Sequence, residues 1–169
     1  RHTRSAGFPY VIIYERFIIF VIVFYNITSR VAICAILNSL VLGIDDIARL
    51  NLFVVMTTDR AIRNRLVNYT NYEEMVGKES SYYQTLNRKF VEFQPVFLNA
   101  TTMLLMGGKI EKTAEGKYCL TNEGNQMAWE LQNYQEGVMG NVRQAAVQLE
   151  AMIGQKDTVT WYKDLKIVL

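Results

Sequence analysis

The sequence predicts a mainly α-helical protein with one small β-hairpin, and three observations support this fold class. Apolar residues recur at steps of three and four through most of the chain, which is the spacing of one helix face. Two short runs, KIEKT and KYCL, flank the turn Ala114-Glu115-Gly116, which is typical of a hairpin. The 169 residues suit one domain, and we predict an N-terminal extension, 1–25, followed by a single helical domain, 26–169.

The first half of the domain is expected to hold four helices. The first covers Ile27 to Gly43 and is apolar nearly all round, so we expect burial on several sides. A second runs from Asp45 to Met56. The segment Thr57-Thr58-Asp59 is expected to cap a third helix over AIRNRLVNY, and Asn71 a short fourth helix.

The second half begins with a helix over Ser80 to Phe93, whose apolar stripe includes Leu86 and Phe90. Proline lacks the N–H that continues a helix, so we expect this helix to stop before Pro95. A new helix, 95–106, is then expected to begin there and to end at Gly107-Gly108.

After the hairpin, Thr121 is expected to cap one long helix that ends at Gly154. Gly137 and Gly140 weaken this helix and mark the place for a bend. The tail DTVTWYKDLKIVL fits a strand as well as a short docking helix.

Composition excludes several kinds of protein. Half of the residues are hydrophobic, which is too many for a disordered chain. Lys and Arg total 18 against 16 Asp and Glu, and this net charge of +2 is too small for a coat on nucleic acid. With one histidine, His2, and two isolated cysteines, Cys34 and Cys119, we expect free buried thiols, no zinc site and no Ser-His-Asp centre.

Residues 10–25, YVIIYERFIIFVIVFY, raise the question of a membrane segment. The uninterrupted apolar run from Phe17 to Tyr25 is shorter than the roughly 20 residues that a spanning helix needs. Its Ile, Val, Phe and Tyr content also suits a buried strand. We favour a buried element of a cytoplasmic protein, with a membrane span or a targeting segment as the alternatives.

The stretch GGKIEKTAEGKYCLTNEG resembles the wing of winged helix-turn-helix proteins, because a helix, a Gly-Gly stop, a hairpin and an LTNEG helix start follow in that order. The resemblance implies a winged-helix module at about 80–125. Many winged helices bind DNA through their recognition helix, but the corresponding segment 95–106 has no Arg or Lys. Since those side chains supply most base and phosphate contacts, we expect this helix to pack against protein.

Two groups of residues are the candidate contacts. The basic ones are expected either to face solvent or to meet a phosphate or an acidic partner: Arg60, Arg63, Arg65, Lys109, Lys112 and Lys117. The apolar ones are expected at a protein interface: Phe97, Leu98, Met103, Tyr134, Trp161 and Tyr162. We find no motif for catalysis, for a cofactor or for a metal, and we expect a protein that is not an enzyme.

From about Ile27 onward the chain resembles the middle component of three-component ABC systems, which include the small subunit of Lamassu-type antiphage and antiplasmid defence. The resemblance lies in RVAICAILNSLV, IARLNLFVVMTTDRAIRNRL, FVEFQPVFLNATTMLLMGGKIEK and the closing WYKDLKIVL. The family more often has a proline in its second apolar helix, where this chain reads LNLFVV. The resemblance implies a non-catalytic adaptor that bridges an SMC- or Rad50-like ATPase and an effector nuclease, with DNA contacted through the assembled complex.

Two other classes fit the sequence. One is a winged-helix transcription regulator whose long helix after Thr121 dimerises, and the other is a membrane-associated accessory protein. Sequence-selective DNA binding by the isolated chain would favour the regulator.

Overall fold

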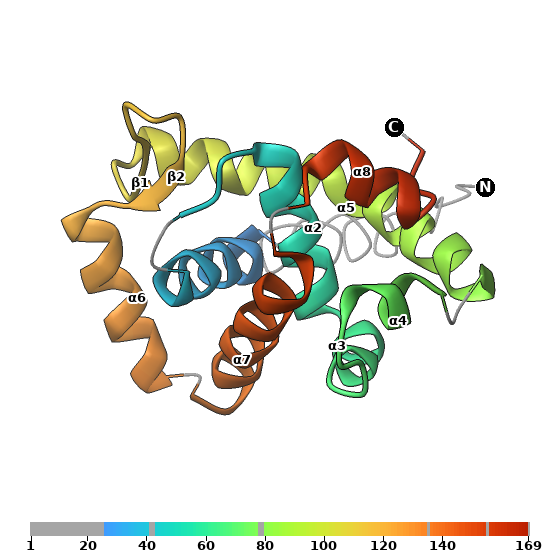
Figure 1. Cartoon of the computed structure of the whole chain (residues 1–169). Coiled ribbons are helices and arrows are strands. Elements are labelled where there is room, and N and C mark those ends of the chain that lie inside the picture. Colours follow the sequence, from blue (N-terminus) through green and yellow to red (C-terminus); the bar gives the residue numbers. More distant parts are fainter. Residues whose placement is uncertain (1–25, 41–42, 78–79, 135, 155, 169) are drawn as a thin grey trace, which may run out of the picture.

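The computed structural model describes residues 26–40, 43–77, 80–134, 136–154 and 156–168 (Figure 1). The predicted extension 1–25 and its apolar run lie outside these residues. Within them the prediction of a mainly helical protein with one small antiparallel sheet is confirmed. The chain forms a helix over residues 26–39, followed by α2 (Ile47–Thr58), α3 (Arg60–Leu66), α4 (Tyr72–Gly77), α5 (Ser80–Met106), β1 (Ile110–Lys112), β2 (Tyr118–Leu120), α6 (Asn122–Tyr134), α7 (Glu136–Ile153) and α8 (Thr158–Asp164).

The helix starts follow from local side-chain chemistry. Asp46 accepts a hydrogen bond from the backbone N–H of Ala48 at 2.8 Å, and this contact caps α2. The predicted caps are also present at Asp59 for α3, at Asn71 for α4 and at Thr121 for α6. Each cap satisfies an N–H that the first turn leaves without a partner.

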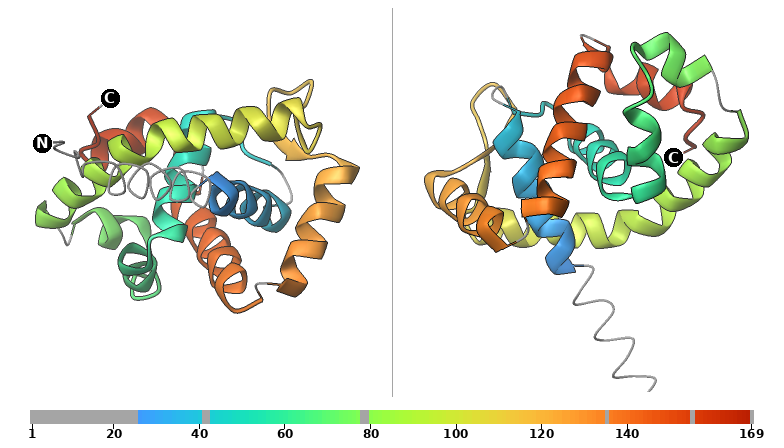
Figure 2. Two further views of the ribbon diagram at one scale, coloured as in Figure 1. Left: turned by 180° about the vertical axis from the view of Figure 1, so that it is seen from behind. Right: turned by 90° about the horizontal axis from the view of Figure 1, so that it is seen from below.

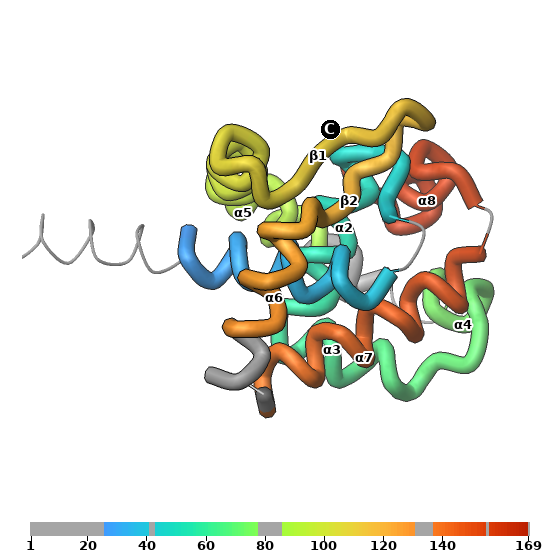
Figure 3. Tube along the Cα trace, turned by 90° about the vertical axis from the view of Figure 1, so that its left-hand side faces the viewer, coloured from blue at the N-terminus to red at the C-terminus, as the bar shows by residue number. Residues whose placement is uncertain are grey.

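The core is built around the helix over residues 26–39, which is enclosed by α5, α6 and α7 (Figures 1 and 2). Every residue from 31 to 37 is buried, which confirms the expected burial on several sides. The α2 helix is buried as completely, from Arg49 to Thr57. Figure 3 looks nearly along α5 and shows that it lies to one side of the other helices.

The predicted break at Pro95 is wrong, because α5 continues through it from Ser80 to Met106. Pro95 and Val91, the residue one turn earlier, are both exposed, so the Val91 carbonyl that proline leaves without a helical partner can bond to water. Phe90 and Phe97 are each 1% exposed and anchor both sides of the proline in the same core. The turn of a helix-turn-helix is therefore absent at this position.

The two strands form the predicted hairpin, in which Ile110 pairs with Leu120 and Lys112 with Tyr118. A third segment joins them, because Ile44 exchanges two backbone hydrogen bonds with Tyr118, at 2.7 and 3.0 Å. The preceding Gly43 has a φ of 68°, a conformation that favours glycine. The hairpin is thus held to the segment between the helix over 26–39 and α2.

The C-terminal third differs from the single long helix that we predicted. It forms two helices that pack against each other: α6 ends at Tyr134, and α7 begins at Glu136, just before Gly137. Gly154, with a φ of 56°, ends α7 as predicted. Of the two predictions for the tail the helix is confirmed, as α8.

Candidate functional site

The surface with the clearest functional character is the outer side of α5. Its inner side is buried through Phe90, Phe97, Ala100 and Leu104. Met106 is exposed at the end of the outer side, and so are three further large apolar residues along it, Val91, Leu98 and Leu105. The last three form a regular row. They are spaced by seven residues, which returns each one to within about 20° of the same direction around the helix.

This outer side is also uncharged over a long distance. From Phe93 to Met106 the sequence has no Asp, Glu, Lys or Arg, although Asn99, Thr102 and Met106 are exposed. A solvated helix surface usually carries charges. An exposed apolar surface without them is characteristic of an interaction site.

Met103 lies on a different flank of the same helix. It follows Leu98 by five residues, which turns it about 140° around the axis. The two side chains are almost equally exposed, at 47% for Leu98 and 46% for Met103. Their exposed fractions are therefore the same, but they face different directions around the helix.

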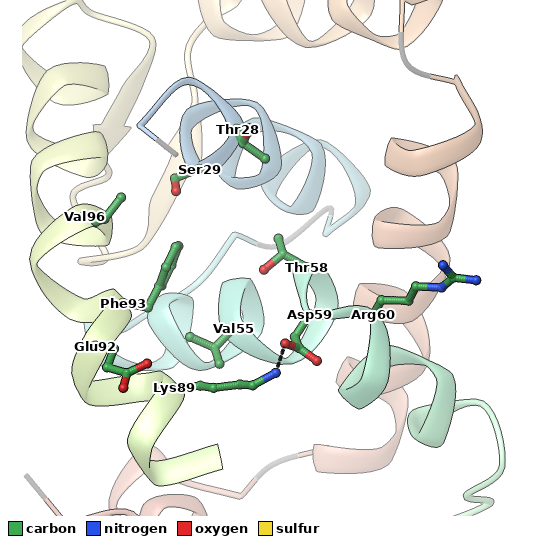
Figure 4. A pocket seen from close by; sticks show the side chains of 10 residues that line it. All are labelled: Thr28, Ser29, Val55, Thr58, Asp59, Arg60, Lys89, Glu92, Phe93 and Val96. Atoms are coloured by element: carbon green, nitrogen blue, oxygen red, sulfur yellow. Dashed lines mark hydrogen bonds and ion pairs between the residues drawn. The ribbon is translucent and has the colours of Figure 1, made fainter. Parts of the chain in front are cut away.

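A cavity of about 580 Å³ lies between the helix over 26–39, the α2–α3 corner and α5. Figure 4 shows Val55, Phe93 and Val96 along its apolar walls, with Thr28 and Ser29 above them. Lys89 reaches across to Asp59, and Glu92 lies at the side. Because Lys89 and Asp59 neutralise each other and the exposed walls of the cavity are mainly apolar, its interior suits an apolar group better than a charged one.

Asp59 joins two contacts at the edge of this cavity. One carboxylate oxygen accepts from the N–H of Ile62 at 3.0 Å, and the other pairs with the ammonium of Lys89. Burial alone would raise the pKa of Asp59, but the Lys89 and backbone hydrogen bonds outweigh it, so the pKa lies below its ordinary value. The carboxylate thus ties α5 to the corner between α2 and α3.

We expect Asp59→Asn to lower the free energy of unfolding by about 1 kcal/mol at pH 7, because it removes the ion pair and keeps a capping side chain. Asp59→Ala should lower it by about 1 kcal/mol more, because the cap is then also lost. The pKa of Asp59 is lower in the folded chain than in the unfolded one. Its ionic contribution is therefore present above the unfolded pKa and is lost as the pH falls through the folded pKa.

The measurement is urea unfolding of the wild type and both variants at pH 7 and at about pH 2.5, below the ordinary carboxyl range. The gap between the wild type and Asp59→Asn should shrink at the lower pH. A gap of the same size at both pH values would contradict the role assigned to the ion pair.

The basic candidate residues do not come together in one site. Arg63 donates to the carbonyls of Thr57 and Thr58 at 2.8 and 3.1 Å, so it stabilises the end of α2. Arg60 and Arg65 are exposed on α3, and the Arg60 side chain points away from the cavity (Figure 4). The α3 helix lies at the opposite end of the molecule from the hairpin (Figure 1).

On the hairpin the lysines are largely engaged within the chain. Lys109 pairs with Glu123 at 2.7 Å, and the Lys112 ammonium lies 5.4 Å from the centre of the Tyr118 ring. Lys117 is half-buried. The six basic residues are therefore divided between two ends of the molecule, and within the hairpin group Lys109 forms the ion pair, with Glu123.

Three of the six predicted interface residues are core residues instead. Phe97 and Trp161 are fully buried, and Tyr162 is 5% exposed and donates its hydroxyl hydrogen bond to the carbonyl of Ala48 at 2.9 Å. Leu98 and Met103 are exposed as an interface requires. The side chain of Tyr134 is outside the described part of the structure.

Sequence reasoning missed Val91, Leu105 and Met106, which are exposed on α5, and Trp129, which is exposed on α6. The seven-residue spacing of Val91, Leu98 and Leu105 was a usable signal. It was obscured because the helix was expected to be interrupted at Pro95.

The cysteines are free thiols. Cys34 is buried, as predicted, and burial raises its pKa to about 12, so it stays protonated. Cys119 is only half-buried, which corrects the expectation for the second thiol. The described ranges hold no group of three or more His, Cys, Asp or Glu that is arranged for a metal. No helix within them is long and apolar enough to span a bilayer.

Comparison with family models, with curated proteins and with solved structures gave no match for this chain.

Proposed function

We propose that the protein is a non-catalytic adaptor subunit that binds a partner protein through the outer side of α5. The observation that carries this proposal is the exposed apolar surface formed by Val91, Leu98 and Leu105 on a helix that has no Asp, Glu, Lys or Arg from Phe93 to Met106. Covering a surface of this kind with another apolar surface lowers the free energy of the system. It offers little to a nucleic acid, whose binding depends on cations.

The arrangement around the hairpin supports a winged-helix module. Ile44 lies between the first two helices and pairs with the second hairpin strand, and the long α5 leads directly into the first. We place the module over 26–120, which is wider than the predicted 80–125, with α3 and α4 inserted before α5. In this assignment α5 takes the place of the recognition helix. Its apolar outer side would bind protein at the position where other winged helices contact DNA.

The family resemblance supplies the class of partner. In the middle components of three-component ABC systems, the adaptor connects an SMC- or Rad50-like ATPase with an effector nuclease in antiphage or antiplasmid defence. We assign the outer side of α5 to the ATPase subunit. The cytoplasm is the compartment in which such a complex meets foreign DNA.

We expect Leu98→Glu to reduce recovery of the ATPase at least tenfold when the tagged full chain is purified from its own operon. A carboxylate in an apolar interface costs more than the roughly 1.4 kcal/mol that a tenfold change represents. Because Leu98 is exposed and glutamate is a good helix former, the variant should fold as the wild type does.

Val159→Glu is the matched control, because Val159 is 78% exposed on α8 and an acid in a first helical turn is favourable. It should recover the ATPase at the wild-type level. Equal recovery with Leu98→Glu would contradict the proposal. Tight, salt-sensitive and sequence-selective binding of DNA by the chain alone would favour the transcription regulator instead.

A further inference from the structure

We propose that the cavity beside Asp59 is the binding site for an apolar segment of this same chain, residues 17–25. We call this segment, FIIFVIVFY, the N-terminal apolar run. The run lies outside the residues that the structure describes, and the residues that line the cavity lie within them. Because it concerns a contact within one chain, this inference does not depend on the proposed function.

The walls of the cavity carry the first step. Val55 from α2 and both Phe93 and Val96 from α5 provide apolar surface, and in Figure 4 their side chains line one common space. The volume of about 580 Å³ lies within the roughly 300–1,000 Å³ that ligand sites have. The cavity therefore takes more than a single small group, and covering its walls with an apolar partner is favourable.

The charges at the cavity carry the second step. Lys89 and Asp59 neutralise each other across it. Of the two other charged residues that line it, Arg60 points away and Glu92 is exposed at the side. A charged occupant would have to break the pair of Lys89 and Asp59 or enter without a counter-ion, and both are costly. The occupant is thus expected to be uncharged as well as apolar.

The N-terminal apolar run has this chemistry. It consists of Phe, Ile, Val and Tyr, and the charged pair Glu15-Arg16 directly precedes it. The hydroxyl of Tyr25 is its one polar side-chain group. In water, side chains of this kind would form an apolar patch of the sort that proteins usually cover. The run therefore matches the cavity in charge and in polarity.

The place of the run in the chain carries the third step. It ends directly before Asn26, the first described residue, which is buried. Thr28 and Ser29 line the cavity from the first turn of the helix over residues 26–39. The run is therefore attached at the cavity wall itself. A short tether gives an effective concentration in the millimolar range, which favours this segment over a free molecule or a second copy.

The test is photo-crosslinking within the purified full chain, with benzoylphenylalanine in place of Phe20 or Phe24. Mixing isotope-labelled and unlabelled chains separates crosslinks within one chain from those between two copies, and mass spectrometry locates each product. We expect the crosslinks to lie within one chain and to fall on 55–60 or 89–96, the segments that line the cavity. Products on other segments, products between two copies or the absence of any product would each overturn the proposal.

Two pairs of variants make the test specific. Val96→Trp fills the cavity and should lower the crosslinking yield by a factor of roughly five or more, whereas Leu98→Trp, about 200° around α5, should leave it unchanged. Phe20→Glu should lower the yield of the Phe24 probe to a similar extent, because a carboxylate is costly in an apolar cavity. Thr3→Glu adds the same charge outside the run and should have no effect. Since Phe20→Glu changes no described residue, it decides the question even if Val96→Trp does not fold.

A lipid bilayer is the competing partner for the run, and flotation with vesicles of phosphatidylethanolamine and phosphatidylglycerol tests it. We expect the full chain to stay at the bottom of the gradient. Flotation that Phe20→Glu abolishes and Thr3→Glu does not would place the run in the bilayer and overturn the cavity assignment. Recovery of the ATPase, which tests the proposed function, is measured separately, so each proposal can fail without the other.

Discussion

Replacing Trp161 with alanine is expected to lower the free energy of unfolding by about 4 kcal/mol, because it empties a fully buried site of large volume. Small domains have only about 5–15 kcal/mol of stability in total. The indole packs edge-on against Phe53, with ring centres 5.7 Å apart, and the Arg49 guanidinium lies 5.6 Å from its ring centre. All of these contacts are lost together.

The substitution should also detach the C-terminal helix. Arg49 donates to the Lys156 carbonyl at 2.7 Å, and Tyr72 donates to Asp164 at 2.8 Å. These hydrogen bonds hold α8 against the core from both ends, and the fully buried Trp161 lies between them. Hydrogen exchange in residues 156–168 should therefore speed up more than exchange in α2.

Two controls separate packing from other effects. The Trp161 N–H has no hydrogen-bond partner among the described residues, so Trp161→Phe loses mainly volume and should cost about 1–2 kcal/mol. Val159→Ala on the same helix should stay within about 0.5 kcal/mol of the wild type. Urea unfolding followed by circular dichroism measures all three. A loss with Trp161→Ala as small as that with Val159→Ala would refute the assignment of α8 to the core.

Replacing Gly124 with alanine is expected to cost about 3 kcal/mol, because the new methyl group has no space. A Cβ at this position would lie 1.8 Å from the carbonyl oxygen of Lys109, and real contacts never approach so closely. That oxygen cannot move freely, since it accepts hydrogen bonds from the backbone N–H and the hydroxyl of Thr121. The start of α6 must therefore shift away from the hairpin.

The matched control is Gly140→Ala, because a Cβ at Gly140 of α7 would meet nothing within 4 Å. Alanine is the better helix former, so this variant should gain up to about 1 kcal/mol. The same substitution is thus expected to lower the free energy of unfolding at Gly124 and to raise it at Gly140. Chemical denaturation measures both changes. Equal midpoints for Gly124→Ala and the wild type would show that the close approach is not present in solution.

The parts of the fold that could be predicted depend on neighbours in the chain. The caps at Asp59, Asn71 and Thr121 each act within three residues of themselves, so the sequence alone was sufficient to place them. The hairpin was predictable for the same reason, because its turn contains Gly116. Its φ of 83° is a conformation that glycine adopts readily.

The errors concern contacts between distant segments. Pro95 does not end α5, because the packing of Phe90 and Phe97 outweighs the loss of one helical hydrogen bond. The pairing of Ile44 with Tyr118 joins residues far apart in sequence, and no local pattern announces it. A helix that is apolar on several sides does not reveal which side is covered, so Phe97 and Leu98 were grouped together although one is buried and the other is exposed.

The continuity of α5 has a mechanical consequence. At 27 residues it is a rod of about 40 Å. One end lies beside the C-terminal residues, where Asn87 accepts from the N–H of Val168, and the other leads into the hairpin. A partner bound to the middle of such a rigid helix could tilt it as a unit. A tilt of α5 would then displace the C-terminal residues and the hairpin together.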